Sequence, residues 1–433
     1  MSSERALLVT VQLDPRFASL GGWSLDDEAR ELQELAASAG CRMVGEVSAK
    51  RHQPVAGTFV GRGKLEEVAG AAQACQAQVV IFNQELSPAQ QRNIEEALRA
   101  KTIDRTQLIL DIFAQRAKSQ EGKVQVELAQ LRYLLPRLSG KGVMLSRLGG
   151  GIGTRGPGEQ KLEIDRRRIR RRISRLGEEL TKLARRREAT RARRKETEAP
   201  VAALVGYTNA GKTTLLNRLT GGGGTAKDQL FTTLDPLARR LKLPAPSSMG
   251  GGPGPSGEAI ILTDTVGFLH QLPHHLIEAF KAMLEEANDA ALLVHVLDAS
   301  HPLVDEHANA VHQVLKQLEL VDKPMVTVLN KRDRMNDASR LEALERLYAP
   351  SCATSAKTGE GLERLLGLIA DQMSLLLVEP TRLRVPVERS ELVASIYQAG
   401  KVLKRQQADG AIELTARLPA TLKHALSSFI IGS

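Results

Sequence analysis

The stretch Gly206-Tyr207-Thr208-Asn209-Ala210-Gly211-Lys212-Thr213 decides how the middle of this chain folds. It fits the pattern G-x-x-x-x-G-K-S/T and lies between an apolar run, residues 201–205, and a helical run, residues 214–219. In this context the glycines let backbone N–H groups turn around phosphates, and the start of the helix adds positive potential. We therefore expect a phosphate-binding loop in which Lys212 reaches the β- and γ-phosphates and Thr213 ligates Mg²⁺.

Two later motifs fit a nucleoside triphosphate with its metal ion. Asp264-Thr265-Val266-Gly267 closes an apolar strand, so Asp264 should hold Mg²⁺ through water and the Gly267 N–H should sense the γ-phosphate. Phe231-Thr232-Thr233-Leu234-Asp235 supplies Thr233 as the threonine that closes on Mg²⁺ and the γ-phosphate. The predicted catalytic residues are therefore Lys212, Thr233 and Gly267, and the predicted metal ligands are Thr213 and Thr233.

Two further motifs select the base. The carboxylate in Asn330-Lys331-Arg332-Asp333 can accept from both N1–H and the exocyclic amine of guanine, which adenine does not present in that arrangement. An acceptor built for those donors rejects the wrong base by a factor on the order of 10⁴, because an unpaired carboxylate is unfavourable. Ser355-Ala356-Lys357 would support the base from the other side. The motifs together predict a GTPase.

One residue of the predicted catalytic site differs from the pattern of Ras-like signalling GTPases. Phe268 stands where Ras-like enzymes carry a glutamine that positions water, and a phenyl ring can neither orient nor deprotonate water. We expect slow hydrolysis in isolation, with a partner that completes the site or orders it. Asn209 adds K⁺ as a second candidate cofactor, because in loops that read Asn-Ala-Gly-Lys this side chain can help hold a monovalent cation between the phosphates.

The whole chain reads as a multidomain α/β protein. Its 433 residues suggest about three domains, and 42% hydrophobic with 25% charged residues excludes a wholly disordered or fibrous chain. Alternating strand and helix signals predict an N-terminal α/β domain over 1–105, with a short strand at 58–60, and a P-loop GTPase domain with a doubly wound parallel sheet over 200–376. Residues 377–433 read as a small C-terminal α+β domain with strands at 382–386, 401–405 and 411–416.

Residues 106–199 predict a long antiparallel helical hairpin. Apolar residues recur at helical spacing on both sides of a segment, Gly149 to Gly158, that holds six glycines in ten residues. Within the second helix, residues 161–195 carry 16 basic and 5 acidic side chains, or +11, whereas the whole chain carries +10. A solvated helix face is the ordinary interpretation of a charge run, but this imbalance is too one-sided for paired bridges and favours contact with RNA.

The spacing of the three cysteines and the hydropathy pattern indicate the cellular compartment in which the protein works. Cys41, Cys75 and Cys352 lie far apart, which offers neither a disulfide framework nor a paired metal-ligand spacing. The longest apolar stretch, residues 290–297, is too short to span a bilayer. We expect a cytoplasmic monomer, and we expect His270, His274 and His275 to be solvated helix residues rather than metal ligands.

These motifs resemble those of the HflX-type GTPases. Within the GTPase region the resemblance rests on GYTNAGKT, FTTLDP, DTVGF with LPHHLIEAF, and NKRD; outside it rests on FVGRGK, IDRTQLILDIFAQRA, EGKVQVELAQL and GGIGTRGPGEQKLEIDRRRI. It covers about residues 5–376. The departures are an insertion at 244–257 and the C-terminal tail, in which no shared motif is apparent.

The resemblance implies a translational GTPase that binds the large ribosomal subunit and splits stalled or idle ribosomes. It also implies that the glycine-rich tip points toward the peptidyl-transferase region, with Gly153, Arg155, Gly156, Gly158 and Glu159 as contacts to ribosomal RNA. A second hypothesis remains, a ribosome-assembly or signalling switch in which GTP only licenses the binding of a partner.

Overall fold

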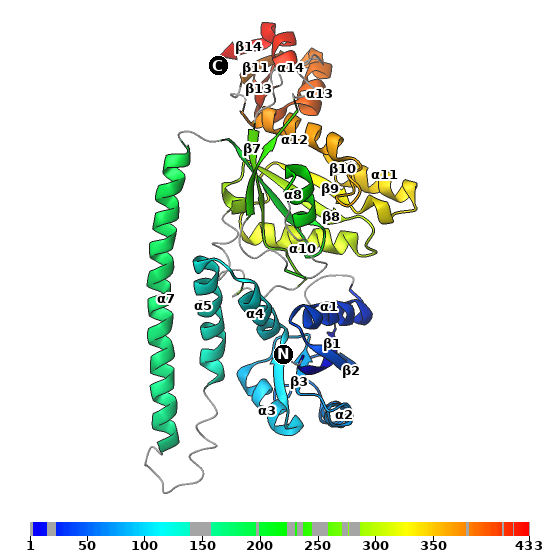
Figure 1. The fold of residues 1–433 in the computed structure, drawn as a ribbon. Helices are drawn as coiled ribbons and strands as arrows, with labels where there is room; N and C mark the ends of the chain where they lie inside the picture. Colours follow the sequence, from blue (N-terminus) through cyan, green and yellow to red (C-terminus); the bar gives the residue numbers. More distant parts are fainter. Residues whose placement is uncertain are drawn as a thin grey trace.

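The computed structural model of the chain describes residues 3–14, 23–138, 157–195, 199–222, 230–231, 237–244, 259–270, 276, 286–377, 381–408, 411–418 and 420–432. Three sheets and a helical hairpin lie within these ranges (Figure 1). The multidomain α/β architecture predicted from the sequence is confirmed. No helix in the described part of the chain is long and apolar enough to cross a bilayer.

The N-terminal sheet is parallel, with strand order β2-β1-β3-β4. Its strands are β1 (Arg5–Leu13), β2 (Arg42–Arg51), β3 (Val79–Phe82) and β4 (Lys101–Asp104). The helices packed around it are α1 (Leu25–Ser38), α2 (Arg62–Ala74), α3 (Pro88–Leu98) and α4 (Arg105–Arg116). Serine capping boxes begin α1 at Ser24 and α3 at Ser87. The strand expected at 58–60 is wrong, because Phe59 adopts a left-handed φ of 62° and forms only an isolated bridge with Val55.

The predicted hairpin is present as α5 (Gln120–Arg137) and α7 (Pro157–Lys195), which run side by side in opposite directions (Figure 1). Val124, Leu128 and Leu176 are buried in the seam between them. Arg172 of α7 binds both carboxylate oxygens of Glu127 on α5, each at 2.7 Å. Of the predicted tip, residues 149–156 lie outside the described residues.

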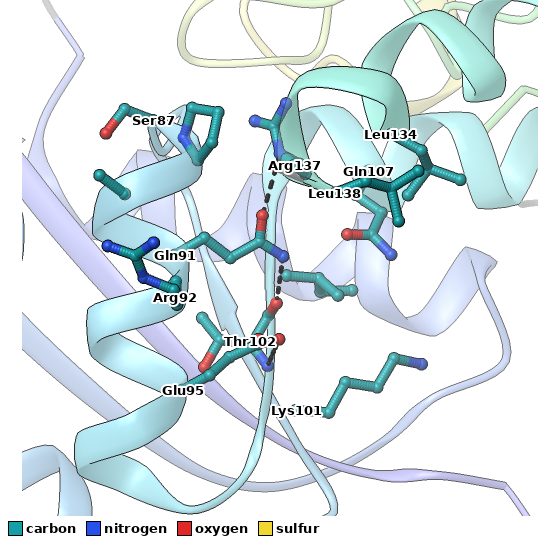
Figure 2. A pocket seen from close by; sticks show the side chains of 13 residues that line it. Ser87, Gln91, Arg92, Glu95, Lys101, Thr102, Gln107, Leu134, Arg137 and Leu138 are labelled. Atoms are coloured by element: carbon teal, nitrogen blue, oxygen red, sulfur yellow. Dashed lines mark hydrogen bonds between the residues drawn. The ribbon is translucent and has the colours of Figure 1, made fainter. Parts of the chain in front are cut away.

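Arg137, in the last turn of α5, anchors this helix to the N-terminal sheet. Its guanidinium donates to the Leu86 carbonyl at 2.7 Å, to Asp104 at 3.2 Å and to Gln91 at 2.9 Å. It also lies 3.4 Å from the centroid of the Tyr133 ring. Figure 2 shows Arg137 and Gln91 among the side chains that line a cleft of about 490 Å³ between α3, β4 and the end of α5. The end of α5 that leads into the tip is therefore fixed to the N-terminal unit by several bonds.

The central sheet has the strand order β10-β9-β8-β5-β7-β6. Its strands are β5 (Val201–Gly206), β6 (Leu237–Lys242), β7 (Ala259–Asp264), β8 (Leu292–Asp298), β9 (Met325–Asn330) and β10 (Ser351–Ala353). Its helices are α8 (Lys212–Thr220), α10 (Val304–Gln317), α11 (Ala338–Leu347) and α12 (Leu362–Leu377). The four strands predicted for this domain, β5, β7, β8 and β9, pair in parallel as expected, whereas β6, which was not predicted, pairs antiparallel with β7. This strand forms the edge of the sheet and buries only Leu241, so the sequence lacked the apolar run of a central strand.

The C-terminal sheet is antiparallel, with the order β12-β13-β11-β14. Its strands are β11 (Thr381–Pro386), β12 (Lys401–Ala408), β13 (Ala411–Arg417) and β14 (Ile430–Gly432), and its helices are α13 (Ser390–Ala399) and α14 (Ala420–Ala425). Leu383, Ile396 and Leu414 form part of a separate buried cluster. The three strands expected here are confirmed, and β14 is an addition to them.

Candidate nucleotide site

The P-loop, residues 206–213, joins the end of β5 to the start of α8. Gly206 has a φ of 155° and Gly211 a φ of 96°. A Cβ at Gly206 would lie 2.3 Å from the Val296 carbonyl oxygen, and one at Gly211 would lie 2.3 Å from the side-chain nitrogen of Asn330. Both the backbone angles and the close neighbours therefore require glycine at the two ends of the loop.

Lys212 folds its side chain back into this loop. Its ammonium donates to the carbonyl oxygens of Gly206 at 2.9 Å and Tyr207 at 2.7 Å. Burial lowers the pKa of Lys212 to about 8, although the Asp264 carboxylate works in the opposite direction. The side chain is thus a buried cation at the centre of the loop, where an incoming phosphate would supply the missing negative charge.

The structure brings the two nearest predicted metal-binding groups together. The Thr213 hydroxyl donates to the Asp264 carboxylate at 2.7 Å. Hydroxyl and carboxylate oxygens are the ligand types that Mg²⁺ prefers, directly or through water. Thr233 and its neighbours Thr232, Leu234 and Asp235 lie outside the described residues.

The two predicted base-recognition loops are bonded to the P-loop through Asn330. Its side chain donates to the Ala210 carbonyl at 2.8 Å and accepts from the Ala356 N–H at 3.0 Å. The Ser355 hydroxyl donates to the Asp333 carboxylate at 2.6 Å. Asp333 is exposed, so its carboxylate remains accessible to a base. The structure thus gathers residues that are separated by more than a hundred positions in the chain.

Two other residues of these loops carry ion pairs that the motifs did not predict. The Lys331 ammonium lies 2.8 Å from the Asp298 carboxylate, and the Arg332 guanidinium lies 3.2 Å from Glu360. Lys357 of the second loop is exposed. These ion pairs hold the loop that follows β9 against its neighbours.

The segment after β7 lies directly on the P-loop. The Thr208 N–H donates to the Phe268 carbonyl at 2.8 Å, and the Phe268 N–H donates to the Gly206 carbonyl at 3.1 Å. A Cβ at Gly267 would lie 3.1 Å from the Lys212 ammonium. Thr265 donates to the Leu204 carbonyl at 2.7 Å, and the Phe268 side chain is only 2% exposed. The predicted γ-phosphate sensor and the P-loop lysine therefore lie close together.

The N-terminal unit reaches into this site through buried polar groups. The Tyr207 hydroxyl donates to Glu31 of α1 and accepts from the His270 N–H at 2.8 Å. Arg105, at the start of α4, lies 2.6 Å from Glu31 and donates to the His270 carbonyl at 2.6 Å. Trp23 stacks on the His270 ring at 4.3 Å with an interplanar angle of 9°. None of these contacts was predicted, and the bulky tyrosine inside the P-loop was the one signal available.

The prediction that His270 is a solvated helix residue is wrong. It is 8% exposed, because Trp23 covers its ring and Tyr207 and Arg105 bind its backbone. Burial lowers its pKa to about 4, so the ring is neutral at physiological pH. His274 and His275 lie outside the described residues.

The start of the other predicted switch segment also contacts the N-terminal unit. Phe231 packs edge-on against Phe113 of α4, with ring centroids 4.6 Å apart and planes at 82°. The Leu230 N–H donates to the Ser38 hydroxyl at 3.1 Å. Both segments that border the predicted γ-phosphate position are thus bonded to residues of the N-terminal unit.

The surface of α7 carries the predicted positive charge. Arg172 is engaged with Glu127, as described above. Many other basic side chains of this helix face solvent: Arg167, Arg168, Arg170, Arg171, Arg175, Lys182 and Arg185. A row of exposed arginines on one long helix is a surface suited to a polyanion.

Four family models match the chain along its length. They are described as "GTP-binding GTPase N-terminal" (residues 26–114), "GTP-binding GTPase Middle Region" (116–194), "50S ribosome-binding GTPase" (201–331) and "HflX C-terminal domain" (345–428). The last match shows that the C-terminal tail, in which no shared motif was apparent from the sequence, resembles the family as well.

Relatives match over nearly the whole chain. A protein named "GTPase HflX" from Caldanaerobacter subterraneus subsp. tengcongensis is 44% identical over 430 residues, which cover 99% of this chain and 94% of the relative. The "GTPase HflX" of Escherichia coli is 42% identical over 395 residues, covering 91% and 90%. A GTP-binding protein from Sulfolobus solfataricus, solved in complex with GDP, is 24% identical with a TM-score of 0.44 and covers 86% of this chain and 99% of its own.

Proposed function

Because the chain belongs to the HflX family of GTPases, and so binds and hydrolyses GTP, we propose that it acts on the large ribosomal subunit and splits stalled or idle ribosomes. The observation that carries this proposal is the exposed arginine surface of α7. Counterions condensed on RNA phosphates are released when such a surface binds, which favours association with ribosomal RNA. We place the protein in the cytoplasm as a monomer.

In this proposal the P-loop, residues 206–213, wraps the phosphates and Lys212 neutralises the charge that develops on them. Thr213 and Thr233 would hold Mg²⁺, with Asp264 holding it through water, and the ion would supply positive charge that offsets the charge of the phosphates. The bond between Thr213 and Asp264 supports this pairing. Asn209, at a left-handed φ of 60° in the loop, keeps K⁺ as a candidate second cation.

Guanine recognition falls to the loops that follow β9 and β10. Asp333 accepts from the base while residues 355–357 support it, and Asn330 holds both loops on the P-loop. The Gly267 N–H senses the γ-phosphate, and the switch segments, residues 231–235 and 264–268, order around it. Phe268 supplies no polar group, so docking on the ribosome stimulates hydrolysis by ordering these segments.

The hairpin is the part that contacts ribosomal RNA. We propose that its tip, including Gly153, Arg155, Gly156, Gly158 and Glu159, approaches the peptidyl-transferase region, and that the arginines of α7 bind RNA phosphates. The bonds of Arg137 to Leu86 and Asp104 support a rigid attachment of the end of α5 that leads into the tip. We divide the chain accordingly into domains at 1–105, 106–199, 200–376 and 377–433.

The test compares GTP turnover of three variants with purified large subunits over a range of salt concentrations. The first lacks residues 149–158, and the second replaces Arg167, Arg168, Arg170 and Arg171 with glutamine. The matched control replaces four basic residues of the C-terminal sheet, Arg382, Arg384, Lys404 and Arg405, also with glutamine. All three variants should keep the slow intrinsic rate.

We expect stimulation of the wild type by about 10³-fold, equivalent to roughly 4 kcal/mol of transition-state stabilisation. The tip deletion should lose most of it, and the α7 variant should bind more weakly with a flatter dependence on salt. Full stimulation of the tip deletion would overturn the coupling. Sedimentation of whole ribosomes with GTP then tests the outcome: free subunits support splitting, and intact ribosomes with bound protein favour the assembly or signalling switch.

A further inference from the structure

The segment after β7 lies close against the P-loop lysine, to which the γ-phosphate is expected to bind. The Lys212 ammonium bonds inward to two loop carbonyls, and a Cβ at Gly267 would lie only 3.1 Å from it. A γ-phosphate bound by both Lys212 and the Gly267 N–H must come between them. GTP binding therefore requires Gly267 to move away from the P-loop, whereas GDP makes no such demand.

Residues of the N-terminal unit hold this segment in its place on the loop. Arg105 donates to the His270 carbonyl, and Tyr207 accepts from the His270 N–H, so both backbone groups of His270 are occupied. Trp23 covers the ring of His270 face to face. His270 lies three residues after Gly267, so fixing it restrains Gly267 as well.

Glu31 in turn fixes the two groups that bind His270. It pairs with Arg105 at 2.6 Å and accepts from the Tyr207 hydroxyl, and all three residues are less than 9% exposed. Burial works to raise the pKa of Glu31, but the adjacent Arg105 outweighs it and holds that pKa below its ordinary value. The carboxylate is thus ionised at physiological pH and binds Arg105 as a charged, hydrogen-bonded pair.

We infer that Trp23, Glu31 and Arg105 form a latch that positions residues 265–270 against the P-loop and thereby sets the preference of the site for GDP over GTP. These are positioning residues, since none of them belongs to a nucleotide-binding motif. The latch lowers the affinity for GTP alone, because only GTP must open it. The inference rests on the proposed binding of GTP at the nucleotide site. It does not depend on binding to the ribosome.

The chain contains one tryptophan, which lies in the latch and reports on it directly. Trp23 is 8% exposed under His270. When full-length protein is titrated with a non-hydrolysable GTP analogue in Mg²⁺, Trp23 emission should shift to longer wavelength as His270 leaves it. GDP should leave the emission unchanged. Equal spectra with saturating analogue and saturating GDP would overturn the inference.

A variant in the latch gives the second readout. Glu31→Gln removes the charge that holds Arg105, and it should raise the GTP affinity relative to the GDP affinity by about tenfold, or about 1.4 kcal/mol. The GDP affinity itself should stay as in the wild type. Asp26→Asn, an equivalent change on the exposed side of the same helix α1, is the matched control and should alter neither affinity.

Trp23→Leu removes the stacked ring without touching the charges, and it should shift the same ratio in the same direction. A merely structural role for these residues would lower both affinities together, and that result in both variants would refute the latch. Neither readout involves ribosomes, so failure of the latch and failure of the proposed ribosomal function are distinguishable.

Discussion

Binding of GTP should take up a proton near pH 8, because Lys212 is the buried cation that the phosphates meet. Burial lowers its pKa to about 8 in the free protein, so about half of the molecules carry a neutral lysine at that pH. When GTP binds, its phosphate oxygens should restore the protonated, charged form of Lys212. Each molecule of GTP bound should take up about 0.5 proton at pH 8, about 0.1 at pH 7 and about 0.9 at pH 9. The affinity should fall by about tenfold from pH 7 to pH 9.

Isothermal calorimetry in two buffers with different ionisation enthalpies measures this uptake. His270, His295 and His307 have pKa values lowered by burial to about 4, 3 and 4, so they are neutral over this whole range and contribute nothing. The control is Lys323→Met, which removes another lysine of lowered pKa outside the site and should leave the uptake unchanged. Binding without proton uptake at pH 8 would refute the buried-cation account.

The lowered pKa of Lys212 also predicts how the free energy of unfolding depends on pH. The pKa of Lys212 is about 8 in the folded protein and about 10.5 in the unfolded chain, so between these values the unfolded chain binds more protons. The Lys212 contribution to the free energy of unfolding should therefore rise with pH from 8 to 10.5. Denaturant unfolding of the nucleotide-free protein measures this contribution, as the difference in the free energy of unfolding between wild type and Lys212→Met at each pH.

Three further predictions follow from individual side chains. Asp333→Asn should abolish the preference for guanine, and direct titration with GTP that gives wild-type affinity would show that the base assignment is wrong. Asn330→Ala leaves the Ala210 carbonyl and the Ala356 N–H without their partner, so denaturant unfolding should show a loss of about 2 kcal/mol or more. Leu176→Ala in the fully buried seam of the hairpin should lower stability by about 2–5 kcal/mol and speed limited proteolysis of α7, while GTP affinity is retained.

The local patterns of the sequence predicted most of the framework. The run from Gly206 to Thr213 is recognisable because its glycines, lysine and threonine stand at fixed spacing between a strand and a helix. The hairpin was readable for the same reason, since apolar spacing on α5 and α7 describes one face of each helix. In both cases the signal lies within a short window of the chain.

What the sequence did not reveal depends on contacts between distant residues. Glu31 and Tyr207 are 176 positions apart, and Arg105 and His270 are 165 apart. Glu31, Arg105 and His270 each look like an ordinary surface residue in their own segments, because charged and histidine side chains usually are exposed. The edge strand β6 was missed for a related reason, since its sequence LARRLK has the composition of a solvated segment until it pairs with β7.

The length of α7 sets a mechanical scale for the molecule. Its 39 residues span about 58 Å at 1.5 Å per residue, and only a few residues separate its end from β5, the strand that runs into the P-loop. A rod of that length turns a tilt of 5° at its base into a displacement of about 5 Å at its far end. The length of α7 therefore converts a small change of angle at its C-terminal end into a displacement of several ångströms at the end that borders the tip.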